Sequence, residues 1–158
     1  MKPPVVVDTN VPVVAHGQSE QASPRCVIAC VLRLADIEKG RYRLVVDDGW
    51  RIIKEYQGNL GPSGQPSPGD RFLKWVLTNR LNADRCQLVS ITEVGGDRGF
   101  REFPDDPAFA TFDAEDRKFV AGACAHPGRP PILEAVDAGW WQAREALRRN
   151  GVSGEVLC

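Results

Sequence analysis

The stretch Val5-Val6-Val7-Asp8-Thr9-Asn10, near the start of the sequence, is a short β-branched apolar run that ends in an acid. Such a run is typical of a buried strand in a parallel sheet. Further apolar runs follow at 44–46, 86–94 and 130–136, with a weaker one at 154–158. Amphipathic segments lie between the runs, at 26–39, 49–59, 70–82, 113–125 and 140–150. This alternation predicts an α/β fold, a three-layer α/β/α sandwich around a central, mostly parallel sheet of four to five strands.

The length and composition indicate one ordinary globular domain over residues 1–158. The chain is 42% hydrophobic and 26% charged, and its 158 residues suit a single core. Its 20 Lys and Arg residues nearly balance 21 Asp and Glu residues, so the net charge is −1. This balance excludes a broadly polycationic nucleic-acid coat, although it leaves room for a local site that handles phosphates.

The apolar runs and the cysteines indicate where in the cell the protein is expected. No segment approaches the roughly 20 apolar residues that span a bilayer, so we expect no membrane association. The five cysteines are odd in number and irregularly spaced, which argues against a disulfide framework. Cys26 and Cys30, one helical turn apart, are therefore expected to be core thiols. These features together favour a reducing compartment, and we expect the protein in the cytoplasm.

Four acids are placed so that they can meet. Asp8 and Asp137 each follow an apolar run, and the carboxyl ends of parallel strands share one edge of a sheet. Glu55 falls on the inward stripe of the helix at 49–59. Asp116 lies in the first turn of the helix at 113–125, on its apolar face. Like charges at short range destabilise one another unless they are protonated or bridged by cations. An oxygen-only ligand set of this kind favours Mg²⁺ or Mn²⁺, which can activate water for attack on a phosphodiester.

Several neighbours compete with these acids or assist them. Asp113 is expected first as the N-cap of its helix and second as an additional metal ligand. Glu134 is a rival to Asp137 because it lies on the same strand. Asp47 and Asp48 are expected to cap the helix at 49–59, and Asn10 is expected to orient Asp8 or a metal-bound water. Of the adjacent Trp140 and Trp141, one is expected in the core, while an exposed one could stack a base.

The motifs around these acids resemble those of the PIN-domain nucleases. The run ending in Asp8-Thr9-Asn10 is similar to the family's opening motif, and Phe112 to Ala121 to its third acidic motif. Glu55 fits the second acid, and Asp137 the fourth. The resemblance covers nearly the whole chain and implies a metal-dependent endoribonuclease, with RNA as substrate. It also implies the toxin role of a toxin–antitoxin pair, with an antitoxin protein as partner.

Other functions remain open at this stage. A phosphatase that forms an aspartyl-phosphate needs a second Asp two residues after the first, where this chain has Asn10. A phospho-acceptor receiver domain needs a Lys near the end of a late strand, and 132–137 contains none. A nuclease acting on DNA and a non-catalytic metal- or partner-binding module both stay open. The Pro- and Gly-rich loop at 61–69 and the irregular segment at 95–112 offer surfaces for a homodimer.

Overall fold

A single parallel sheet forms the centre of the fold. The structure is a computed structural model that describes residues 2–17, 19–61 and 67–158, so most of the loop expected at 61–69 lies outside it. The five strands are all parallel and lie in the order β3-β2-β1-β4-β5. Their bounds are β1 Pro4–Val7, β2 Arg43–Asp47, β3 Cys86–Val89, β4 Ile132–Glu134 and β5 Gly154–Val156. The expected α/β class and parallel sheet are confirmed.

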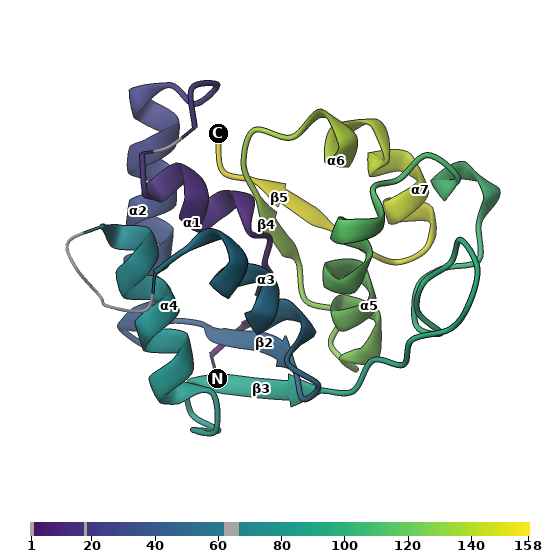
Figure 1. Ribbon diagram of the computed structural model, residues 1–158, viewed down its shortest axis with the longest axis horizontal. Coiled ribbons are helices and arrows are strands. Elements are labelled where there is room, and N and C mark those ends of the chain that lie inside the picture. Colours follow the sequence, from purple (N-terminus) through teal and green to yellow (C-terminus); the bar gives the residue numbers. More distant parts are fainter. Residues whose placement is uncertain (1, 18, 62–66) are drawn as a thin grey trace.

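Helices cover both faces of this sheet and complete the three-layer sandwich. Helices α1, α2 and α4 pack together on one side, and α5, α6 and α7 lie on the other (Figure 1). Helix α3 packs against both α4 and α5. The α-helices are α1 Asn10–Ala15, α2 Pro24–Glu38, α3 Arg51–Asn59, α4 Pro68–Asn79, α5 Arg117–Ala125, α6 Ala138–Gln142 and α7 Arg144–Arg149. Two short 3₁₀ segments span Pro107–Phe109 and Ala114–Asp116. Within the described residues, none of the helices has the length and apolar character needed to cross a membrane.

The central strand positions the first acid. Val5, Val6 and Val7 are all buried, because β1 has a strand on each side and helices on both faces. The Tyr56 hydroxyl of α3 donates a hydrogen bond of 2.6 Å to the Val7 carbonyl and so ties α3 to the carboxyl end of β1. Asp8 follows directly, at the middle of the sheet edge where ligands bind in folds of this class.

Several predicted elements differ from the observed ones. β3 ends at Val89 rather than near 94, because its one neighbour, β2, already ends at Asp47, opposite Val89. β4 is likewise shorter than the predicted 130–136, since its partners offer only short ladders. The single helix predicted at 140–150 is two helices that meet at Ala143. Helix α1 was not predicted, because its six residues are too few to show a periodic pattern.

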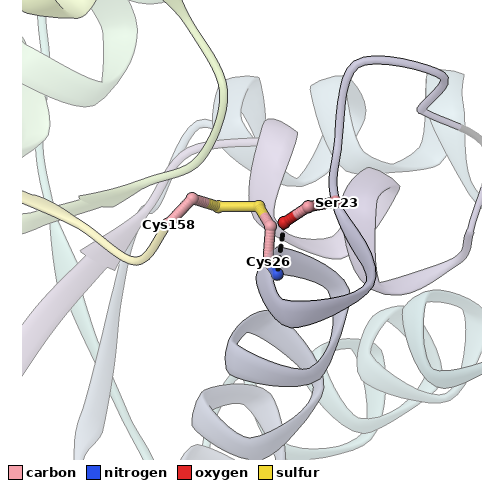
Figure 2. The surroundings of a disulfide bond; sticks show 3 residues. All are labelled: Ser23, Cys26 and Cys158. Carbon is pink, nitrogen blue, oxygen red and sulfur yellow. Dashed lines mark hydrogen bonds between the residues drawn. A yellow bond between two sulfur atoms is a disulfide. The ribbon is translucent and has the colours of Figure 1, made fainter.

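The prediction that Cys26 is a core thiol is wrong. Cys26, in the first turn of α2, forms a disulfide with Cys158, which follows β5 (Figure 2). The two Cα atoms lie 4.6 Å apart although 132 positions separate the residues in sequence. Irregular spacing did not reveal the pair, since only the tertiary fold brings the two segments together. Cys30 is a buried free cysteine, as expected.

Removal of this disulfide should lower stability measurably. In Cys158→Ser we expect the free energy of unfolding of the oxidised protein to fall by about 2–4 kcal/mol, because the crosslink closes a long loop in the unfolded chain. Urea unfolding followed by circular dichroism measures the change. A strong dithiol reductant should bring the wild type down to the level of the variant. Equal urea midpoints for the oxidised wild type and the variant would contradict a stabilising disulfide.

Candidate functional site

Asp8 is a buried carboxylate at the carboxyl edge of the sheet. Its side chain lies directly after β1, and the residue is only 1% exposed. Its backbone N–H donates a 2.9 Å hydrogen bond to the carbonyl of Leu133 in β4, which fixes Asp8 between the two central strands. The backbone N–H of Asn10 donates to Asp8 Oδ2 at 3.2 Å. Burial of a carboxylate with so little compensation makes Asp8 a candidate functional residue.

Three further carboxylates face Asp8 and shift its titration. Burial raises the pKa of Asp8 well above its ordinary value, and the charges of Asp116, Asp137 and Glu134 raise it further. Burial, with Asp137 next in weight, also raises the pKa of Asp116 to about 7. The pKa of Glu134 rises to about 7 for the same two reasons, with a contribution from Asp116. We call these four residues the acidic cluster: Asp8, Asp116, Glu134 and Asp137.

Asn10 links two members of the acidic cluster. Its side-chain Nδ2 donates to Asp137 Oδ2 at 3.0 Å, while its backbone holds Asp8. Asp137 does not end β4, as the sequence suggested, but lies three residues beyond it as the N-cap of α6. Its Oδ1 accepts a hydrogen bond of 2.8 Å from the N–H of Gly139. The capping bond uses one carboxylate oxygen and leaves Oδ2 directed to Asn10.

Glu134 is the member that sequence reasoning treated only as a rival to Asp137. The structure brings both residues to the same cluster. Glu134 is 5% exposed, and its Oε2 is buried without a hydrogen-bond partner. Its position as the last residue of a buried strand, like that of Asp8 just after one, is the signal that identifies it.

Glu55 lies at the border of the acidic cluster rather than within it. Its carboxylate accepts a 2.9 Å bond from Lys118 Nζ, and the same ammonium pairs with Glu115 at 3.2 Å. The charge of Glu55 still contributes to the raised pKa of Asp116, so the two carboxylates face a common region. Lys118 thus supplies a cation at one side of an otherwise acidic edge.

Three acids next to the acidic cluster make local hydrogen bonds instead of joining it. Asp113 is exposed and accepts a 2.9 Å bond from the N–H of Glu115, so it caps the 3₁₀ turn Ala114–Asp116 that leads into α5 rather than α5 itself. The structure shows no direct bond from Asp113 to the cluster, although its charge reaches Asp116. Of the two acids predicted to cap α3, Asp47 holds its start by accepting bonds from the N–H groups of Arg51 and Ile52. Asp48 instead accepts a bond from the Ser90 hydroxyl.

The acidic cluster has the donor chemistry of a hard-cation site. All four residues offer carboxylate oxygens, the ligands that Mg²⁺ and Mn²⁺ prefer, and Glu134 Oε2 is a buried acceptor without a partner. Among the described residues, only one group of three or more His, Cys, Asp or Glu side chains has ligand atoms that all lie within 4.8 Å of one another, and its three members are cysteines. No three carboxylates of the acidic cluster therefore lie that close together.

Comparison of the chain with family models, curated proteins and solved structures found no match in any of the three.

A cavity adjoins the acidic cluster on its β5 side. Its volume is about 310 Å³, and Glu134 forms part of its wall together with α6, α7 and β5. Trp140 is buried, whereas Trp141 is 58% exposed, so the expectation that one of the pair belongs to the core is confirmed. The Arg144 guanidinium lies 3.9 Å from the centroid of the Trp141 ring. An aromatic face and an arginine beside a set of acids are suited to hold a base and a phosphate.

The raised pKa values predict an unusual dependence of stability on pH. The pKa values of Asp116 and Glu134 rise from ordinary values of 3.8 and 4.5 to about 7, so the folded protein keeps protons that the unfolded chain has released. Stability of the metal-free protein should therefore fall as pH rises from about 4 to about 7. Urea midpoints between pH 4 and 8 in EDTA measure this, and Asp116→Asn should flatten the profile. A wild-type midpoint that rises over this range would contradict the raised pKa values of Asp116 and Glu134.

Proposed function

We propose that the protein is a metal-dependent nuclease that hydrolyses RNA phosphodiester bonds. The observation that carries the proposal is the burial of Asp8 among Asp116, Asp137 and Glu134 at the carboxyl edge of a parallel sheet. Uncompensated carboxylates at such an edge are costly for folding, and a divalent cation resolves that cost. The order of the acids along the chain, which resembles that of PIN-domain nucleases, supports the same function.

The residues of the acidic cluster have distinct roles in this proposal. Asp8, Asp116 and Asp137 hold Mg²⁺ or Mn²⁺, and Glu134 completes the ligand set from the β4 side. A cation held by these residues would supply activation of water and neutralisation of charge on the phosphate. Asn10 keeps Asp8 and Asp137 in position through its backbone and side-chain bonds. Glu55, which is paired with Lys118, is proposed to orient a water molecule for the attack.

The surroundings of the acidic cluster suit a flexible, single-stranded nucleic acid. Trp141 and Arg144 can stack a base and contact a phosphate on the β5 side. On the opposite side, Arg51, Lys54 and Lys118 line a second depression together with Glu55. A single-stranded RNA that crosses the acidic cluster between these two surfaces would place one of its phosphates over the cation.

The choice of RNA and of partners rests on the resemblance. An antitoxin that inserts a cationic side chain into the acidic edge, and a homodimer, belong to the proposal as predictions. A cytoplasmic location also stays a prediction, but the cysteines no longer support it, because Cys26 and Cys158 form a disulfide. The rival function is a non-catalytic binding module with the same cation site.

A cleavage assay separates these alternatives. Purified protein is incubated with end-labelled single-stranded RNA, and with DNA of matching sequence, in Mg²⁺, Mn²⁺ or EDTA. We expect RNA cleavage with either metal and none with EDTA. Preferential cleavage of the DNA would show that DNA, rather than RNA, is the substrate. Undiminished cleavage in EDTA would overturn the metal-dependent mechanism, and metal binding without cleavage of either strand would favour the binding module.

A further inference from the structure

Three of the five cysteines meet outside the acidic cluster. Cys26 and Cys30 lie on α2, one helical turn apart, and Cys158 follows β5. Each offers a sulfur, and the three sulfurs all lie within 4.8 Å of one another. The remaining two, Cys86 in β3 and Cys124 in α5, are free cysteines on other elements. A sulfur group assembled from the two ends of the sequence is a specific feature of the fold, distinct from the oxygen ligands discussed above.

We propose that Cys26, Cys30 and Cys158 form a thiolate site for one Zn²⁺ ion, or another thiophilic d¹⁰ cation, when the Cys26–Cys158 disulfide is reduced. Soft thiolate ligands favour such cations over Mg²⁺ and Mn²⁺, so this site and the acidic cluster select different metals. The proposal does not depend on nuclease activity.

Opening the site is a two-electron step. A dithiol reductant supplies two electrons and two protons, the Cys26–Cys158 S–S bond breaks into two thiols, and the reductant becomes a disulfide. With Cys30 this gives three thiols. The cation then replaces three thiol protons, which pass to solvent. Three sulfur ligands leave a fourth tetrahedral position for water or an added ligand.

The local structure favours the thiolate form of Cys26, whereas burial raises the pKa of the Cys30 thiol to about 11, so the cation has to displace that proton. Cys26 lies in the first turn of α2, where its N–H is held by Ser23 Oγ at 3.2 Å and where the helix dipole stabilises negative charge (Figure 2). Cys30 is buried below it, whereas Cys158 is exposed, so a cation can enter from the Cys158 side. An ion pair of 2.6 Å between Arg33 of α2 and Glu155 of β5 joins the same two elements. This ion pair is a contact between α2 and β5 that does not depend on the disulfide.

Either state of the sulfur group anchors the segment after β5. The N–H of Leu157, next to Cys158, donates a 2.9 Å bond to the carbonyl of Glu134. The disulfide or the thiolate site therefore holds a segment that contacts the backbone of an acidic-cluster residue.

Cobalt titration of the full chain tests the proposal, because Co²⁺ bound to thiolates gives an intense sulfur-to-metal charge-transfer absorption that carboxylate ligands do not produce. In the reduced protein we expect this band to saturate at one Co²⁺ per chain and Zn²⁺ to displace it. The oxidised protein should show no such band. Cys158→Ser changes an exposed residue and should weaken Co²⁺ binding at least about 100-fold. The matched control Cys124→Ser should bind as the wild type does.

Two results would overturn the site. The first is a reduced wild type without the charge-transfer band, which would leave the disulfide as the only role of the pair. The second is an equal loss of the band in Cys124→Ser and Cys158→Ser. Circular dichroism of each variant checks that the fold is retained, and Cys26→Ser provides an independent variant on the helix side.

Discussion

Asp8→Asn is expected to lower metal-dependent RNA cleavage at least about 10³-fold while making the metal-free protein more stable above pH 7. The substitution keeps the shape of the side chain, and its amide oxygen can still accept the Asn10 N–H. It removes a buried negative charge that faces Asp116, Asp137 and Glu134. Loss of activity together with a gain in stability is the signature of a residue retained for function rather than for folding.

The measurements are single-turnover cleavage in Mg²⁺ and urea unfolding in EDTA. Asp48→Asn is the matched control, because Asp48 also follows a strand at this edge but pairs with Ser90 outside the acidic cluster. We expect its cleavage rate to stay within about threefold of the wild type. Cleavage by Asp8→Asn at the wild-type rate would refute the assigned role of the acidic cluster.

Two acids that lie three residues apart should respond very differently to the same change. Asp116→Asn is expected to reduce cleavage at least about 100-fold, because Asp116 is partly buried and faces Asp8, Asp137 and Glu134. Asp113→Asn should keep cleavage within a fewfold of the wild type, since Asn also caps helices well. Rates for both variants in saturating Mg²⁺ measure the difference.

The capping role of Asp113 can also be tested through the free energy of unfolding. Asp113→Ala should lower the free energy of unfolding by about 1 kcal/mol without abolishing cleavage. If Asp113→Asn instead lost as much activity as Asp116→Asn, Asp113 would have to be a metal ligand and the observed hydrogen bond to Glu115 a secondary feature.

The fold was largely predictable because its signals are local. Buried parallel strands read as short β-branched runs, and the inward stripe of α3 is visible in the spacing of Ile52, Ile53 and Tyr56. Strand ends were not predictable, since β3 stops where its neighbour β2 runs out. The Cys26–Cys158 disulfide was missed for the same reason, because it depends on where β5 ends in space.

The site was predicted in part. Strand position indicated Asp8, and helix phase indicated Asp116, because both are properties of a single element. The inclusion of Glu134 beside Asp137 depends on the exact length of β4, which sequence did not give. The ion pair between Glu55 and Lys118 joins two helices, so no pattern within either helix predicts it.

The most direct test of the metal-dependent account is a crystal structure of the protein soaked in Mn²⁺, with anomalous scattering used to locate the cation. The account predicts a manganese peak within coordination distance of Asp8, with Asp116 and Asp137 drawn toward it, and no such peak in Asp8→Asn crystals. A peak elsewhere in cleavage-competent crystals, with the acidic cluster unchanged, would contradict the account.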